Sequence, residues 1–288
     1  MTMKRFAPVA ALVLLVRASA LHAEVEVPQP SPGAWVSQKV GLAKVALAYH
    51  RPAVKGRPIW GGLVPFGEVW RLGANDATTL ELSHPARVGG KELAAGKYAL
   101  FAIPAKDKWT IIVNSQSDQW GAYFRDAMKD VLSFEVMPAA AAHQEWLEFR
   151  LLPETKDAVR VEMAWEKLRI SFPVEFDGKA IVWKQFDDAL ATAGPKDYLT
   201  HYQVAKYAFQ TGERKEKAMG WLDEAMTRGQ SFWMDELKGD LLAEEGKYAE
   251  AIPHLVKAIE GSKKAGAPEA WRDGAKKKLD GWAAKAKG

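Results

Sequence analysis

The stretch from Arg51 to Asp76, RPAVKGRPIWGGLVPFGEVWRLGAND, gathers the side chains of this sequence that are best suited to binding chemistry. Its 26 residues include four cations, two tryptophans, five glycines and three prolines, without helical or strand periodicity. Glycine and proline allow an irregular segment to fold back on itself. Guanidinium groups that converge in such a loop match the geometry of a carboxylate or a phosphate. The four cations are Arg51, Lys55, Arg57 and Arg71.

A second interpretation of the same cations is purely structural. Each arginine could pair with an acid such as Glu68, Asp76 or Glu81, or could cap carbonyl groups that the irregular backbone leaves free. The sequence alone leaves both interpretations open.

Tryptophan and amide side chains in and near this loop suggest sugar binding. Exposed aromatic faces stack on sugar rings, and amide or carboxylate groups bind hydroxyls, although large aromatic residues also fill cores. Trp120, in SDQWGAY, is the best candidate for exposure because its neighbours are polar or glycine. We therefore predict a site for a small polar or anionic ligand, with glycans included. The predicted ligand-binding residues are Arg51, Lys55, Arg57, Trp60, Trp70, Arg71, Asn75, Asp76, Asn114 and Trp120.

Signals for catalysis are weak. The chain has no cysteine and no GxSxG motif, and His50, His84 and His143 are not at metal-ligand spacing. We expect no cofactor, no metal and no catalytic residue, hence a non-enzymatic binding or scaffolding protein. Two alternatives stay open: a hydrolase of cell-envelope carbohydrate or ester that uses Asp76 or Glu68 as acid/base, and a purely structural envelope protein.

The elements that must position these residues are strands. Short runs such as KYALFAIP, WTIIVN and EWLEFRLL, rich in β-branched and aromatic residues, predict a jelly-roll-like β-sandwich over residues 24–177. Gly89-Gly90 predicts a hairpin. The apolar phase flips at Glu166-Lys167, which either a two-residue hairpin or a bulge would explain. Glu-Lys is a poor pair for such a turn, so we predict a bulge that bends one long strand, and Pro173 suggests that the later part of that strand lies at an edge.

Helical periodicity replaces the strand pattern over residues 178–288. Residues 198–226 and 233–261 repeat with an offset of 33, which aligns Ala218 with Ala251 and Leu222 with Leu255. The period and the small residues resemble tetratricopeptide helix pairs, which commonly bind protein partners. The predicted class is α+β as a whole: an all-β sandwich followed by an all-α repeat domain.

The first 23 residues have the layout of a secretory signal peptide. Lys4 and Arg5 precede an apolar run at 6–16 and then small residues, and cleavage after Ala20 or after Ala23 fits the pattern. The run is about half of the ~20 residues that a membrane-spanning helix needs. We expect cleavage, no later transmembrane segment, and a periplasmic or secreted protein.

The charge balance argues against nucleic acid as a partner. The leader carries three of the 40 basic residues and no acid, which leaves 37 bases against 36 acids. Residues 263–288 hold eight basic residues and three acids, a pattern typical of a solvated helix face.

Several ordered blocks resemble one bacterial family. They are SQKVGLAKVALAYHRPAVKGRPIWGGLVPFGEVWRLGANDATTLELS, AGKYALFAIP, KWTIIVN, QWGAY and AWEKLRISFPVEF, which together cover roughly residues 32–176. The sequence looks like the family called domain of unknown function 2911. The resemblance implies an exported β-rich domain, sometimes joined to tetratricopeptide-like helices, and implies no established activity.

Overall fold

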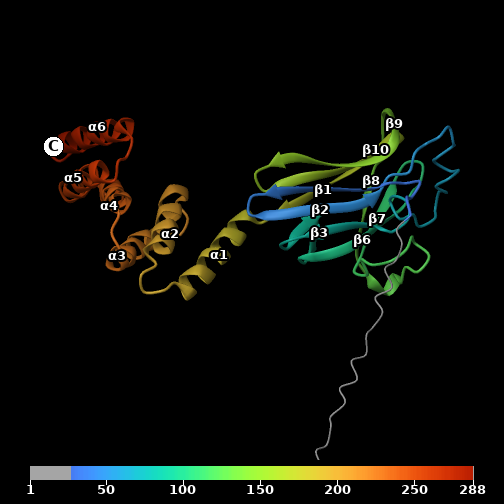
Figure 1. Cartoon of the computed structure of the whole chain (residues 1–288), viewed down its shortest axis with the longest axis horizontal. Helices are drawn as coiled ribbons and strands as arrows, with labels where there is room; N and C mark the ends of the chain where they lie inside the picture. The colour runs from blue at the N-terminus through green and yellow to red at the C-terminus, as the bar shows by residue number, and fades with distance from the viewer. Residues whose placement is uncertain (1–26, 288) are drawn as a thin grey trace, which may run out of the picture.

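The computed structural model describes residues 27–287, which form an antiparallel β-sandwich followed by six α-helices (Figure 1). The predicted α+β class, with a sandwich before a helical part, is confirmed. The last strand ends at Phe176 and the first helix begins at Gly178. The predicted signal peptide, residues 1–23, lies outside the described residues. Within residues 27–287, no helix is both long and apolar enough to cross a bilayer.

The sandwich consists of one six-stranded and one four-stranded sheet. In spatial order the larger sheet contains β1 (Gly33–Val40), β2 (Ala43–His50), β3 (Thr78–Leu82), β6 (Gly96–Ile103), β7 (Trp109–Asn114) and β8 (Asp130–Val136). The smaller contains β5 (Lys91–Leu93), β4 (Ala86–Val88), β10 (Ala158–Phe176) and β9 (Ala139–Thr155). Most neighbours in a sheet are consecutive in sequence, so the strands run as meanders rather than alternating between the sheets as in a jelly roll.

Alternating side chains explain why the sheets stack. Along β2, Val45, Leu47 and Tyr49 are buried, while the residues between them face away from the core. These side chains belong to one cluster with β10 residues such as Val161 and Phe172. Burial of this apolar surface between the sheets is the main stabilising contribution.

The predicted hairpin and bulge are both present. Gly89 and Gly90, with φ of 56° and 80°, connect β4 to β5. The strand β10 is continuous through Glu166, where φ is 55° and the register with β9 shifts on both sides. Beyond Arg169 that register with β9 ends, so the segment containing Pro173 borders no β9 residue. The bulge shifts the alternation of apolar and polar side chains along β10 by one residue, as the sequence pattern indicates.

The irregular loop at 51–77 is held to the sandwich by a tryptophan tetrad. Trp60 and Trp70 from the loop each contact Trp109 of β7 and Trp165 of β10, with ring centroids 4.8 to 6.1 Å apart. The backbone of Trp70 also exchanges two hydrogen bonds with Ala102 of β6, at 2.7 and 2.8 Å. Aromatic packing and this short bridge therefore fix the middle of the loop.

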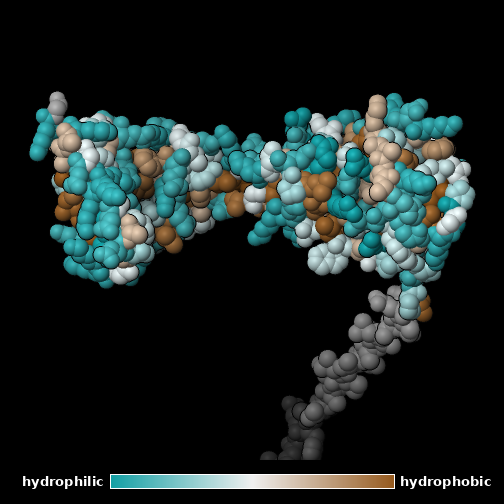
Figure 2. All heavy atoms as spheres, turned by 90° about the horizontal axis from the view of Figure 1, so that it is seen from above, coloured by the Kyte–Doolittle hydropathy of each residue, from teal (hydrophilic) through white to brown (hydrophobic). Residues whose placement is uncertain are grey.

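The helical part contains the two predicted helix pairs. The helices are α1 (Gly178–Thr192), α2 (Tyr198–Thr211), α3 (Ala218–Arg228), α4 (Phe232–Glu244), α5 (Tyr248–Lys264) and α6 (Glu269–Lys285). The aligned residues Ala218 and Ala251 are fully buried, and so are Leu222 and Leu255. Small residues at these positions let the helices of each pair approach closely. Figure 2 shows hydrophobic residues on the surface of α1, between the two parts of the chain.

The hairpin glycines provide a matched stability test. A Cβ at Gly89 would overlap the ring of Phe134, whereas one at Gly90 would meet nothing within 4 Å. We expect Gly90→Ala to cost about 1 kcal/mol for the left-handed backbone. Gly89→Ala adds overpacking and should cost about 2 to 4 kcal/mol. Urea unfolding measures the free energy of unfolding of both variants. An equal loss of stability in the two would show that Phe134 does not pack against Gly89.

Candidate functional site

The structure places the loop arginines on main-chain carbonyl groups. Arg51 Nε donates to Leu147 O at 2.9 Å. Arg57 donates to the carbonyls of Val54 and Ala53 within its own turn. Arg71 Nη1 donates to Asn75 O at 3.0 Å, and its guanidinium lies 5.8 Å from the ring centre of Tyr123. This geometry matches the second interpretation of the sequence, in which the arginines cap carbonyls of an irregular backbone.

Lys55 contributes to the loop through its main chain. Its N–H donates to Glu145 Oε1 at 2.9 Å, and the N–H of Val54 donates to the Glu145 carbonyl at 2.8 Å. The hydrogen bond from Lys55 holds the pKa of the Glu145 carboxyl below its ordinary value. Glu145 therefore joins the start of the loop to β9.

The other predicted residues divide between core and surface. Trp60 and Trp70 belong to the tetrad. Asn114 is fully buried, and its amide donates to Asp126 O and Asp130 Oδ1. The Asn75 carbonyl accepts from Gly121 N at 3.0 Å, and Asp76 pairs with Trp120 in a short antiparallel bridge. The structure thus brings Arg71, Asn75, Asp76 and Trp120 together at one end of the sandwich.

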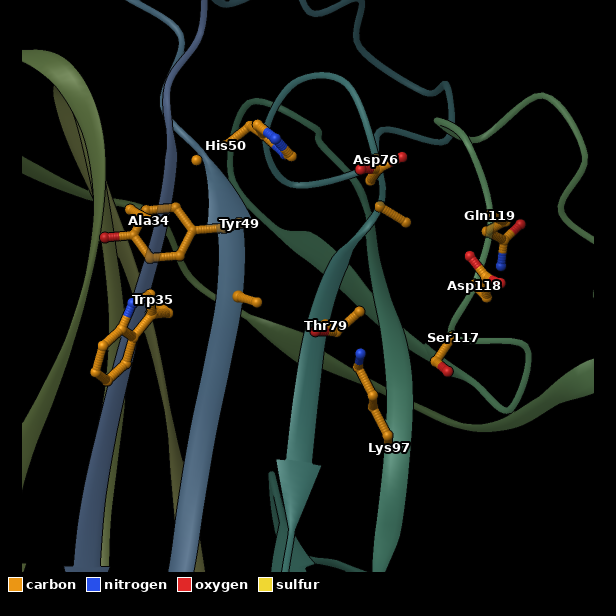
Figure 3. A pocket seen from close by; sticks show the side chains of 13 residues that line it. Ala34, Trp35, Tyr49, His50, Asp76, Thr79, Lys97, Ser117, Asp118 and Gln119 are labelled. Carbon is orange, nitrogen blue, oxygen red and sulfur yellow. The ribbon is translucent and has the colours of Figure 1, made fainter. Parts of the chain in front are cut away.

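A hollow of about 530 Å³ lies on the face of the larger sheet that points away from the core (Figure 3). Asp76 is the one sequence-predicted binding residue among those that line it. Trp35 on β1 stands on one side and the segment 117–119 on the other. The side chains on which the site depends are Trp35, His50, Asp76, Thr79, Lys97 and Asp118.

Strand register creates this hollow. Trp35 pairs with Ala48, which in turn pairs with Thr79, so the three side chains share the outer face of neighbouring strands. Ala48, the small central residue, leaves space between its larger neighbours. Figure 3 shows the His50 ring reaching from β2 toward Asp76, and Lys97 extending toward Thr79.

The hollow combines an aromatic surface with mixed polar groups. The Trp35 residue is 78% exposed, although large indoles normally pack inside. Asp76, Asp118 and Lys97 supply two carboxylates and one ammonium group. His50 Nδ1 and Gln119 Oε1, in the wall, are buried without a hydrogen-bond partner in the described part of the chain. Both residues line the hollow, although these two atoms are not themselves exposed to it.

Across residues 27–287, no three histidine or acidic side chains come close enough together to hold a metal ion. In the hollow, the Trp35 indole can stack on a ring, and the polar lining groups can both donate and accept hydrogen bonds.

Sequence reasoning missed Trp35, His50, Thr79, Lys97 and Asp118 as members of one site. The available signal was Trp35 in GAWVSQKV, an aromatic residue in the alternating pattern of a strand. The pairing of β1 with β2 decides which face of the sheet carries Trp35. The sequence alone does not reveal that pairing.

Arg57 and Lys55 form a matched pair for testing the structural role of the loop cations. Arg57→Ala removes donors from two carbonyl groups and should lower the free energy of unfolding by about 1 to 3 kcal/mol. Lys55→Ala keeps the main-chain hydrogen bond and removes only an exposed side chain, so its effect should stay within about 0.5 kcal/mol. Chemical denaturation measures both, and an unaltered stability of the Arg57 variant would contradict the capping role.

The Glu145 contact should weaken in acid. Because the folded-state pKa is lowered, this contribution is complete above the ordinary value of 4.5 and is lost as the pH falls through the lowered pKa. The hydrogen-exchange protection factor of the Lys55 amide should therefore fall in acid, while that of Val54, bonded to a carbonyl, should change less. In Glu145→Gln the Lys55 protection should lose this pH dependence. A Lys55 amide equally protected across the range would contradict the contact.

Comparison with known proteins gives one match. A family model described as "Protein of unknown function (DUF2911)" covers residues 31–174. No curated protein and no solved structure matches the chain. The matched region is half of the sequence and runs from just before β1 into β10, so it contains both sheets, the loop and the hollow. The chain therefore belongs to the DUF2911 family.

Proposed function

We propose that the protein is a binding module whose sandwich holds a polyhydroxylated ligand, such as a glycan, in the hollow beside Trp35. Sugar rings present apolar C–H faces that stack on an indole, and hydroxyl groups that both donate and accept hydrogen bonds. The hollow offers partners of both kinds. In keeping with the signal-peptide pattern, we place this activity in the periplasm or outside the cell.

Charge in the hollow favours a neutral ligand over an anion. Asp76 and Asp118 carry one negative charge each, and Lys97 carries one positive charge. Two carboxylates would repel a phosphate or carboxylate, whereas they accept hydrogen bonds from hydroxyls. The loop arginines, which would have favoured an anion, already donate to carbonyl groups.

One observation carries this proposal: the exposed indole of Trp35 shares one hollow with Asp76, Asp118 and Lys97, which offer hydrogen-bond acceptors and a donor. An exposed tryptophan alone has many explanations. Its coincidence with polar groups in a cavity large enough for a sugar unit supports binding there.

A hydrolase is the second candidate, because two carboxylates line the same hollow. Glycoside hydrolysis requires an acid and a base or nucleophile on either side of the scissile bond. Asp76 and Asp118 would take these roles. Asp118→Asn should then abolish turnover of oligosaccharides, and binding without turnover by the unaltered protein would favour the binding module.

For the helical part, we propose contact with a protein partner. A groove of about 700 Å³ between its helices is lined by Tyr198, Phe232, Asp235, Lys257 and Lys264, among others. Asp235 is 6% exposed, and Lys257 Nζ lies 3.0 Å from its carboxylate. Lys264→Glu alters this groove without touching the hollow, so it separates the two roles.

The binding proposal predicts loss of affinity on truncation of Trp35. In calorimetric titrations with soluble chito- and cello-oligosaccharides, Trp35→Ala should weaken binding at least about tenfold, or about 1.4 kcal/mol. Trp35→Phe should retain part of the affinity because it keeps an aromatic face. Asp76→Asn keeps the shape of the site and tests the hydrogen bonds.

Tyr123→Ala is the matched control, since Tyr123 and Trp35 are each 78% exposed but Tyr123 lies outside the hollow. It should bind oligosaccharides as the unaltered protein does. If Trp35→Ala binds equally well, or if the Tyr123 variant loses the same affinity, the hollow is not the binding site.

A further inference from the structure

The loop between β7 and β8 presents a compact group of exposed apolar side chains. Trp120, Tyr123, Phe124 and Met128 are 50%, 78%, 71% and 90% exposed, within nine residues. We call these four residues the aromatic loop. Lone exposed apolar residues are common on proteins, but a cluster of large ones marks an interaction surface.

The backbone that carries the aromatic loop is firmly attached. Gly121 N donates to Asn75 O, and Ala77 N donates to Gln119 O at 3.1 Å. Asp126 caps the short 3₁₀ helix η1 (Ala127–Lys129) through Met128 N at 2.9 Å. The exposed side chains are thus displayed from a fixed support, which reduces the entropy lost when they bind.

The start of the described chain lies beside the aromatic loop. Asn75 Nδ2 donates to Ser31 O at 3.2 Å, while the carbonyl of Asn75 accepts from Gly121 N. One residue therefore joins the N-terminal segment to the loop, and Figure 1 shows the loop near the point where the described chain begins.

The cations next to the aromatic loop differ in their partners. Arg125 forms an ion pair with Asp130, and Arg71 donates to the Asn75 carbonyl. Lys129, directly after Met128, is exposed and forms no ion pair among residues 27–287. Its long stem can keep the ammonium group in water or at the lipid headgroups while the apolar side chains beside it are buried. Trp and Tyr are also the residues that favour the headgroup level of a bilayer.

We propose that the aromatic loop inserts into the interfacial region of a lipid bilayer and holds the sandwich at the membrane surface. The insertion is shallow and monotopic, driven by the apolar area of the four side chains. It is independent of ligand binding in the hollow, because Tyr123, Phe124 and Met128 do not line that cavity.

Site-specific labelling can test this directly, since the chain contains no cysteine. The full chain carrying Tyr123→Cys or Met128→Cys is labelled with an environment-sensitive dye and mixed with phosphatidylcholine vesicles. The dye emission should shift to shorter wavelength and should be quenched by brominated lipid chains. Met137→Cys is the matched control: Met137 is 76% exposed and follows β8 at the end opposite to the loop.

Each dye reports how deeply its own position enters the bilayer, so the test is decisive even if the apolar leader also binds vesicles. Quenching at positions 123 and 128, with none at 137, supports the proposal. An unshifted dye at 123 overturns it, whether or not the chain sediments with vesicles. Equal quenching at 137 also overturns it. Tyr123→Ser/Phe124→Ser should abolish quenching of a dye at 128, and its oligosaccharide affinity should be unchanged.

Discussion

The packing of Trp60 and Trp70 against Trp109 and Trp165 is the constraint on which the functional end of the sandwich depends. A loop of this length and composition has no regular backbone pairing to hold it. The tetrad supplies a large buried aromatic area instead, and the bridge between Trp70 and Ala102 fixes the chain direction. The indole N–H groups of Trp60, Trp109 and Trp165 make no hydrogen bond within the described residues, a cost that the aromatic packing must exceed.

The attachment of the loop through the tetrad positions two surfaces, the hollow and the aromatic loop. Beyond Trp70 the chain reaches Asn75 and Asp76. Asp76 lines the hollow, and Asn75 joins the N-terminal segment to Gly121 of the loop that carries the exposed aromatic side chains. The arginines of the loop stabilise its irregular backbone by donating to carbonyl groups.

Local features of the fold could be predicted because their causes are local. Gly89-Gly90 allows the positive φ angles that the hairpin needs. The phase flip at Glu166 fits a hairpin or a bulge, and Glu-Lys is a poor pair for a two-residue turn, which favours the bulge that the structure contains. The helix pairs follow from the periodic small residues such as Ala218 and Ala251. The strand order departs from a jelly roll because that order depends on contacts between distant segments.

The candidate site was harder to predict because its residues meet only through tertiary pairing. The acceptor of Arg51 is the carbonyl of Leu147, 96 positions away, so no local pattern distinguishes capping from anion binding. Trp35, Ala48 and Thr79 share a face only once β1, β2 and β3 are in register. Asp76 was predicted because it stood in a loop rich in binding residues, and Trp35 was missed because it stood in a plain strand.

Chemical-shift mapping of the isotopically labelled protein during titration with chito- and cello-oligosaccharides would locate the binding site residue by residue. We expect the Trp35 indole N–H and the backbone amides of His50, Thr79 and Lys97 to shift together and to saturate at one concentration. Shifts that leave these signals in place and cluster around Arg51 and Arg57, or in the helical part, would contradict this expectation, as would an unchanged spectrum with every oligosaccharide.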